Sequence, residues 1–122
     1  MNTTQDIIRA LHNVRVPAQP GEYDIHAMIA EALAVSEVEF VHEYRLGPRC
    51  RVDFLCGDVA IEVKKGRPLP SALARQLTRY LESDEVREMI VVLQKRVTLP
   101  ETIRGKRVWV VSLNANWGLA LP

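Results

Sequence analysis

The sequence contains no long hydrophobic run, no internal repeat and no low-complexity tract. No stretch of about 18 or more apolar residues occurs, so no transmembrane helix is predicted. The start, MNTTQDIIRALHNVR, lacks the basic residues and apolar core that mark a secretion signal, and we expect a cytoplasmic protein with no membrane partner. No linker divides the chain, so we expect one domain over residues 1–122.

Cysteine is scarce. Cys50 and Cys56 are expected on one strand, where six residues span roughly 20 Å, and this separation excludes a disulfide between them. Two cysteines also cannot form a four-cysteine zinc or iron–sulfur site within one chain. We therefore expect both to be small, buried apolar residues.

The net charge is only +1, which by itself does not indicate a nucleic-acid partner. The charged residues are unevenly distributed along the chain. Residues 1–61 contain 5 Lys or Arg against 9 Asp or Glu, whereas residues 62–122 contain 11 against 6. The second half is therefore basic, with the clusters KKGR, RQLTR, QKR and RGKR.

The spacing of apolar residues predicts three helices and five strands. Helical spacing occurs in residues 3–13, 22–36 and 71–83. Alternating or continuous apolar runs typical of strands occupy residues 39–46, 51–56, 59–64, 88–94 and 106–113. The residues TLPETIRG, between the last two runs, are expected to form a turn. This order of two helices, three strands, a helix and two strands predicts an α/β fold with a mixed central sheet flanked by helices.

Residues 51–64 predict a β-hairpin that brings charged residues together. Gly57-Asp58 is a two-residue loop of type II′, which needs a positive φ at its first position and favours glycine there. If Cys56 pairs with Val59, the period of two makes one face entirely apolar, with Val52, Phe54, Cys56, Val59, Ile61 and Val63. The opposite face then carries Asp53, Glu62 and Lys64, with Asp53 directly across from Glu62.

Two carboxylates placed directly opposite each other on neighbouring strands repel. A divalent cation would remove this conflict, because Mg²⁺ commonly binds one or two protein carboxylates and completes its shell with water and phosphate. Lys64 could then stabilise charge on a phosphate or position a water. The alternative is that Asp53 and Glu62 form separate salt bridges with Arg51 and Lys64 on a solvated sheet face.

These residues resemble the PD-(D/E)XK nuclease superfamily, which has a restriction-endonuclease-like core: Asp53 lies on one strand and residues 62–64 supply the E-x-K on the next. Val52 replaces the proline of the motif. QLTRY, residues 76–80, is similar to the Q-x-x-x-Y helix motif of RecB-type members. The resemblance implies a core at about residues 22–113, with the first helix and the C-terminal tail as additions.

The resemblance implies an Mg²⁺-dependent deoxyribonuclease that hydrolyses phosphodiester bonds, with Mn²⁺ substituting for Mg²⁺. Its catalytic residues would be Asp53, Glu62, Lys64 and Gln76. The metal ligands would be Asp53, Glu62 and a helix residue, either His26 or Glu31, with Glu22 as a further alternative. Residues that would bind nucleic acid are Lys65, Arg67, Arg75, Arg79 and Tyr80.

Other interpretations of these residues remain open. Tyr80 and Gln76 could belong to the packing stripe of their helix, and Arg75 and Arg79 to a solvated face. A structure-selective, Holliday-junction-resolvase-like dimer is one alternative function, and the apolar tail with Trp117, Leu119 and Leu121 would suit a homodimer. A larger nuclease–helicase-type assembly is the other partner that we consider. A non-cleaving nucleic-acid-binding module is another, although the intact Asp, Glu and Lys argue against it.

Overall fold

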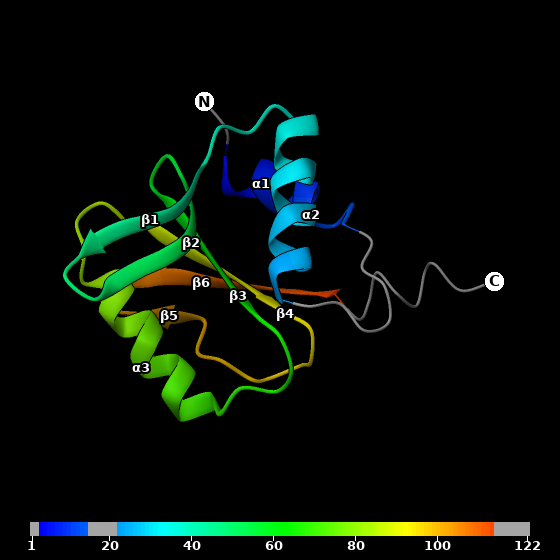
Figure 1. The fold of residues 1–122 in the computed structure, drawn as a ribbon. Coiled ribbons are helices and arrows are strands. Elements are labelled where there is room, and N and C mark those ends of the chain that lie inside the picture. Colours follow the sequence, from blue (N-terminus) through cyan, green and yellow to red (C-terminus); the bar gives the residue numbers. More distant parts are fainter. Residues whose placement is uncertain (1–2, 15–21, 114–122) are drawn as a thin grey trace.

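Residues 3–14 and 22–113, which the computed structural model describes, form a mixed six-stranded sheet with helices on both faces (Figure 1). The sequence therefore predicted the α/β class correctly. The elements, in chain order, are α1 (Thr4–Leu11), α2 (Glu22–Val35), β1 (Val41–Gly47), β2 (Cys50–Cys56), β3 (Val59–Lys64), α3 (Pro70–Leu81), β4 (Glu88–Leu93), β5 (Thr102–Ile103) and β6 (Lys106–Ser112).

Local signals fix where the helices begin. The Thr3 side chain accepts a hydrogen bond from the Asp6 N–H and the Asp6 carboxylate accepts one from the Thr3 N–H, which forms a capping box for α1. Helix α3 begins at Pro70, whose missing N–H and fixed φ suit the first helical position. Both helices begin within one residue of the predicted positions.

The strands follow the order β1-β2-β3-β4-β6-β5, with β3-β4 and β4-β6 parallel and the other neighbours antiparallel. Strand β4 is central and buried on both faces. Its Ile90 and Val92 pack with α1 and α2, whereas Met89, Val91 and Leu93 pack with α3. The crossover from β3 through α3 to β4 thus places α3 opposite the other two helices (Figure 1).

Strand β5 was not predicted from the sequence, which assigned this segment to a turn. It has only two residues, Thr102 and Ile103, and pairs with β6 through a hairpin. The two loop residues, Arg104 and Gly105, have φ values of 56° and 75°. Positive φ at both central positions closes tight hairpins, but arginine is not a residue that signals such a turn.

The hairpin register is confirmed where β2 pairs with β3: Cys56, Leu55 and Phe54 lie opposite Val59, Ala60 and Ile61. Gly57 has the expected positive φ, 63°.

The prediction that Val52 shares a face with Phe54 is wrong, because Val52 packs with α3 and Phe54 packs with α1 and α2. On β1, Glu43 lies between the partners of these two residues and has a left-handed φ of 57°. This backbone conformation interrupts the alternation of faces.

Both cysteines lie on β2 and are free, with Cys56 buried and Cys50 half-buried. Within residues 3–14 and 22–113, no helix has the length and hydrophobicity needed to cross a membrane. The tail residues considered for a dimer contact, Trp117, Leu119 and Leu121, lie outside the described residues.

Candidate functional site

The candidate site lies where β2 separates from β3. Pairing between these strands ends at Phe54 and Ile61, so the predicted direct pair of Asp53 with Glu62 is not formed. Instead, Asp53 Oδ2 accepts a hydrogen bond of 2.7 Å from the backbone N–H of Val63. The Asp53 carboxylate thus takes the place of a backbone carbonyl of β2 as acceptor for β3, at the point where the side chains of β2 change faces. This contact holds Asp53 next to the E-x-K segment.

Glu62 is a buried carboxylate, with only 4% of the residue exposed. Its Oε2 lies 3.2 Å from Lys64 Nζ and accepts a hydrogen bond of 3.3 Å from the Tyr80 hydroxyl. Its Oε1 is buried without a hydrogen-bond partner. Burial, and then the negative charge of Asp53, raise the pKa of Glu62 to about 7, although Lys64 and Tyr80 act in the opposite direction.

Helix α3 brings the Q-x-x-x-Y residues to Glu62. Gln76 Nε2 donates a hydrogen bond of 2.8 Å to the Tyr80 hydroxyl, which in turn donates to Glu62. The two side chains are four residues apart and therefore lie on the same side of the helix. Burial and the neighbouring Glu62 raise the pKa of Tyr80, so its hydroxyl stays a donor at neutral pH. Gln76 and Tyr80 together fix the orientation of Glu62.

Helix α2 contributes His26, whose Nε2 lies 3.7 Å from Asp53 Oδ2 and is buried without a hydrogen-bond partner. Its Nδ1 lies 2.9 Å from Nε2 of His42. The His42 ring stacks on Phe54, with ring centroids 4.7 Å apart. His42 is not among the site residues predicted from the sequence. Its position opposite Phe54 in the β1–β2 register, one residue from Asp53, is the signal that identifies it.

Glu31, the alternative helix ligand, is not brought to this site. It is exposed and lines a separate pocket with Met28 and Val35. Five residues separate Glu31 from His26, which places them about 140° apart around a helix of 3.6 residues per turn. Of these two residues, the structure therefore brings only His26 close to Asp53. The side chain of Glu22 lies outside the described part of the chain.

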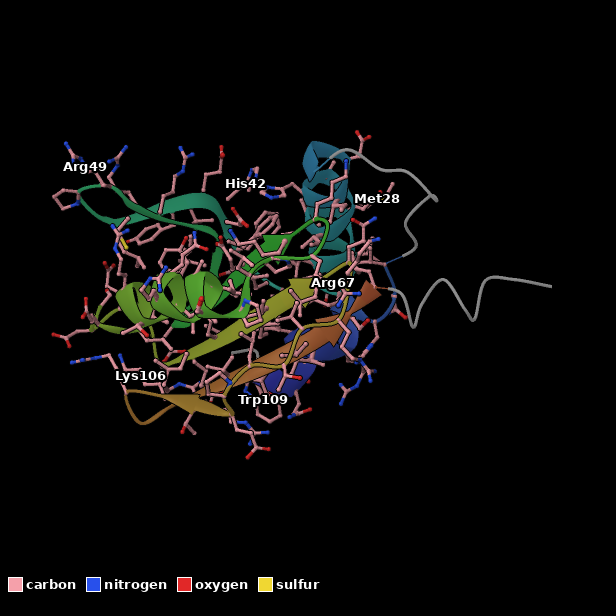
Figure 2. The ribbon with its side chains drawn as sticks, turned by 90° about the horizontal axis from the view of Figure 1, so that it is seen from below. Met28, His42, Arg49, Arg67, Lys106 and Trp109 are labelled. Carbon is pink, nitrogen blue, oxygen red and sulfur yellow. The ribbon has the colours of Figure 1, made fainter. Side chains whose placement is uncertain are left out.

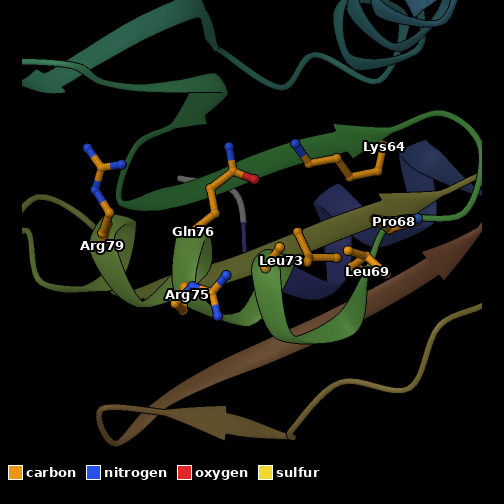
Figure 3. Close-up of a pocket in the computed structure, with 8 residues that line it drawn as sticks. Lys64, Pro68, Leu69, Leu73, Arg75, Gln76 and Arg79 are labelled. Carbon is orange, nitrogen blue, oxygen red and sulfur yellow. The ribbon is translucent and has the colours of Figure 1, made fainter.

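Beside the carboxylates, a groove of about 460 Å³ runs between β3 and α3, and Lys64, Gln76, Arg75 and Arg79 are among its lining residues. Figure 3 shows the Lys64 ammonium directed toward Gln76, while Arg75 points away from them. Lys65 and Arg67 are exposed but do not line this groove. Arg67 instead donates a hydrogen bond of 3.3 Å to the carbonyl of Arg96.

The donor set around Asp53 is compatible with a hard divalent cation. Glu62 Oε1 and His26 Nε2 are buried and unpartnered, and both side chains interact with Asp53. Among the described residues, no three His, Cys, Asp or Glu side chains are grouped closely enough to enclose a metal. Mg²⁺ needs no such group, since one or two carboxylates, water and a substrate phosphate complete its coordination.

Comparison with known proteins adds no relative from which a role could be transferred. The chain matches no protein-family model, no curated protein and no solved structure. The interpretation of the site therefore depends on the geometry of its own residues.

Proposed function

We propose that this protein is a divalent-metal-dependent nuclease that hydrolyses phosphodiester bonds in DNA, with a restriction-endonuclease-like core of the PD-(D/E)XK type. The observation that carries the proposal is the incomplete hydrogen bonding of the buried Glu62 carboxylate. Both of its neighbours, Lys64 and Tyr80, bind the same oxygen, Oε2, and Oε1 stays buried and unpartnered. Leaving a buried carboxylate oxygen unsatisfied is costly, and a cation is the ligand that two adjacent carboxylates accept best.

In this proposal Asp53 and Glu62 hold the cation, and His26, whose Nε2 lies 3.7 Å from Asp53 Oδ2, borders it from α2. A bound Mg²⁺ or Mn²⁺ would polarise the scissile phosphate and lower the pKa of a water. The protein supplies a fixed geometry: the Val63 N–H holds Asp53, and Tyr80, itself contacted by Gln76, holds Glu62. These contacts set the carboxylate orientations before substrate binds.

Lys64 has the role of charge stabiliser. Its ammonium is partly exposed, with 26% of the side chain accessible, and it lines the groove. A phosphate lying in the groove would therefore meet this cation next to the carboxylates. Hydrolysis joins a water oxygen to phosphorus, breaks one P–O ester bond and transfers a proton to the departing oxygen. Negative charge grows on the phosphoryl oxygens during this step, and a fixed ammonium stabilises it.

The test of this proposal is incubation of the purified protein with linear duplex, single-stranded, nicked and branched DNA. Each substrate is supplied with Mg²⁺, with Mn²⁺ or with a chelator. We expect cleavage of at least one substrate with metal and none with chelator. The absence of cleavage of all four substrates with either metal would favour a non-cleaving binding module.

Gln76→Ala should slow cleavage clearly while it changes the free energy of unfolding only slightly. The substitution removes the hydrogen bond to Tyr80 at a half-buried position, so we expect the free energy of unfolding to change by less than about 1 kcal/mol. Cleavage should fall by roughly ten-fold, because Glu62 is held less firmly. Urea denaturation and single-turnover cleavage measure the two effects. Wild-type cleavage by this variant would show that the Q-x-x-x-Y residues only pack the helix.

A further inference from the structure

A second groove, of about 410 Å³, lies between the β1–β2 hairpin and α3. It is lined by Arg45, Arg49, Cys50, Arg51, Gln76, Arg79 and Tyr80. Gln76 and Arg79 also line the groove beside Lys64, so the two grooves meet on α3. Figure 2 shows Arg49 at the far end of the hairpin. A basic path therefore leads from Lys64, past Gln76, to the arginines of the hairpin.

Like charges face each other in the hairpin. Arg45 is the cross-strand partner of Arg51, an arrangement that repels unless an anion lies between the side chains. Arg51 has one acidic neighbour, Glu43, at 3.8 Å, and both side chains of that pair are at least half exposed. Within the described residues, neither Arg45 nor Arg49 has an ion pair of its own. The hairpin thus keeps positive charge that the protein itself does not neutralise.

This second groove, the arginine groove, is also preformed. Arg79 Nη2 donates a hydrogen bond of 2.9 Å to the carbonyl of Arg49, which ties the end of the hairpin to α3. The Tyr44 hydroxyl donates a hydrogen bond to Glu85, beyond the end of α3. A ligand that enters this groove does not have to order the hairpin first, which lowers the entropic cost of binding.

The lining indicates which form of nucleic acid fits. Proteins that grip single strands stack the bases on exposed aromatic rings. The aromatic residue in this lining, Tyr80, is only 5% exposed, and its hydroxyl already donates to Glu62. The groove therefore offers guanidinium groups for phosphates and no platform for bases. Phosphates are presented without exposed bases along the backbone of a duplex.

We propose that the arginine groove of the β1–β2 hairpin binds the phosphate backbone of double-stranded DNA and leads it to the carboxylates. The inference deepens the proposed nuclease function and rests on it for the identity of the polyanion. Arg45, Arg49 and Arg79 contact phosphates of a duplex whose neighbouring phosphates lie at Lys64. Binding is independent of base sequence and depends strongly on salt.

The test is a binding measurement made without metal, so that cleavage plays no part. Fluorescence anisotropy follows a labelled duplex DNA titrated with protein in chelator at several salt concentrations. The variant Arg45→Gln/Arg49→Gln should bind roughly 10- to 60-fold more weakly at about 0.1 M salt, and the slope of log K against log salt should shrink by about 1.8, since each phosphate contact contributes about 0.9.

Two further variants separate the effect of these two arginine charges from effects on folding and on net charge. Arg45→Lys/Arg49→Lys preserves the charge, so it should keep most of the salt slope even if the hairpin tolerates glutamine poorly. Arg9→Gln/Arg104→Gln removes the same charge at exposed positions on α1 and the β5–β6 turn, and it should bind as wild type does. Melting curves of all variants show whether each is folded.

Equal affinity and equal salt slope for the glutamine variant and the wild type would overturn the assignment of the groove. Tighter binding of a single strand than of the duplex by the wild type would overturn the assignment to duplex DNA. Duplex binding that needs the arginines, without cleavage in Mg²⁺ or Mn²⁺, would refute the nuclease function and leave the groove assignment intact. Cleavage in Mg²⁺ or Mn²⁺ together with binding that does not need the arginines would refute the groove assignment and leave the nuclease function intact.

Discussion

Glu62→Gln is expected to abolish cleavage while it stabilises the metal-free protein. The substitution removes a cation ligand from the proposed site, and activity should fall by at least about 1000-fold. Stability should change in the opposite direction above about pH 7, because there the wild-type protein buries an ionised carboxylate next to Asp53. Glutamine keeps the shape and the acceptor for Tyr80 but carries no charge.

The stabilisation should depend on pH in a defined window. The pKa of Glu62 is raised from 4.5 to about 7 in the folded protein, so between these values the folded state holds a proton that the unfolded chain releases. The free energy of unfolding of the wild type therefore falls as pH rises from about 4.5 to 7, by up to about 3 kcal/mol, and stays low at higher pH. Below about pH 4.5 this difference between variant and wild type disappears.

Urea denaturation from pH 4 to pH 9, in chelator, measures this effect. Glu39→Gln removes a carboxylate at an exposed position and serves as the matched control, for which no such pH step is expected. A Glu62→Gln variant that is less stable than the wild type at about pH 8 would show that Glu62 is a favourable buried salt-bridge partner of Lys64 and not a strained carboxylate.

Lys64→Ala is expected to lose cleavage and keep metal binding. The ammonium is not a metal ligand, and its removal takes positive charge away from the carboxylates, so a cation should bind at least as well. Cleavage should fall by about 100- to 1000-fold, which is the usual effect of removing one donor that stabilises transition-state charge. Lys64 also lowers the pKa of Glu62, so its removal raises that pKa further, and the comparison is made at about pH 8.5, well above the wild-type value of about 7.

Single-turnover cleavage and metal titration by calorimetry measure the two properties of Lys64→Ala separately. Lys95→Ala, at an exposed position after β4, is the control for loss of a lysine charge. Loss of metal binding together with cleavage would indicate that Lys64 holds the carboxylates in place and does not act on the phosphate.

Much of the fold could be predicted because local signals and periodicity agreed. The capping residue Thr3, the helix start at Pro70 and the turn at Gly57 are each specified within a few residues of sequence. The short strand β5 could not be predicted, since two residues carry no periodicity and their turn uses arginine at a positive φ. The change of faces at Asp53 depends on Glu43, a residue on another strand whose backbone conformation has no signature in the sequence.

Part of the arrangement around Glu62 could be predicted from the sequence, and the rest of the candidate site could not. The period of two along β3 correctly put Glu62 and Lys64 on one side, where Lys64 Nζ reaches Glu62 Oε2. The contact of Asp53 with the Val63 N–H was not predictable, because it requires β2 to leave β3 after Phe54, whereas a regular hairpin would continue to Arg51. The contact of His26 with His42 joins α2 to β1, and the packing of those two elements was not predicted from the sequence.

The most direct test of the cation site is the melting temperature of the wild type, Asp53→Asn and Glu62→Gln with increasing Mn²⁺. A cation that binds only the folded state adds RT ln(1 + [L]/Kd), about 2.7 kcal/mol at a hundred times Kd. For a chain of this size we expect the wild-type melting temperature to rise by roughly 8 to 15 °C. Both variants should lose most of this rise. No rise in the wild type, or an equal rise in all three proteins, would contradict the assignment of Asp53 and Glu62 as cation ligands.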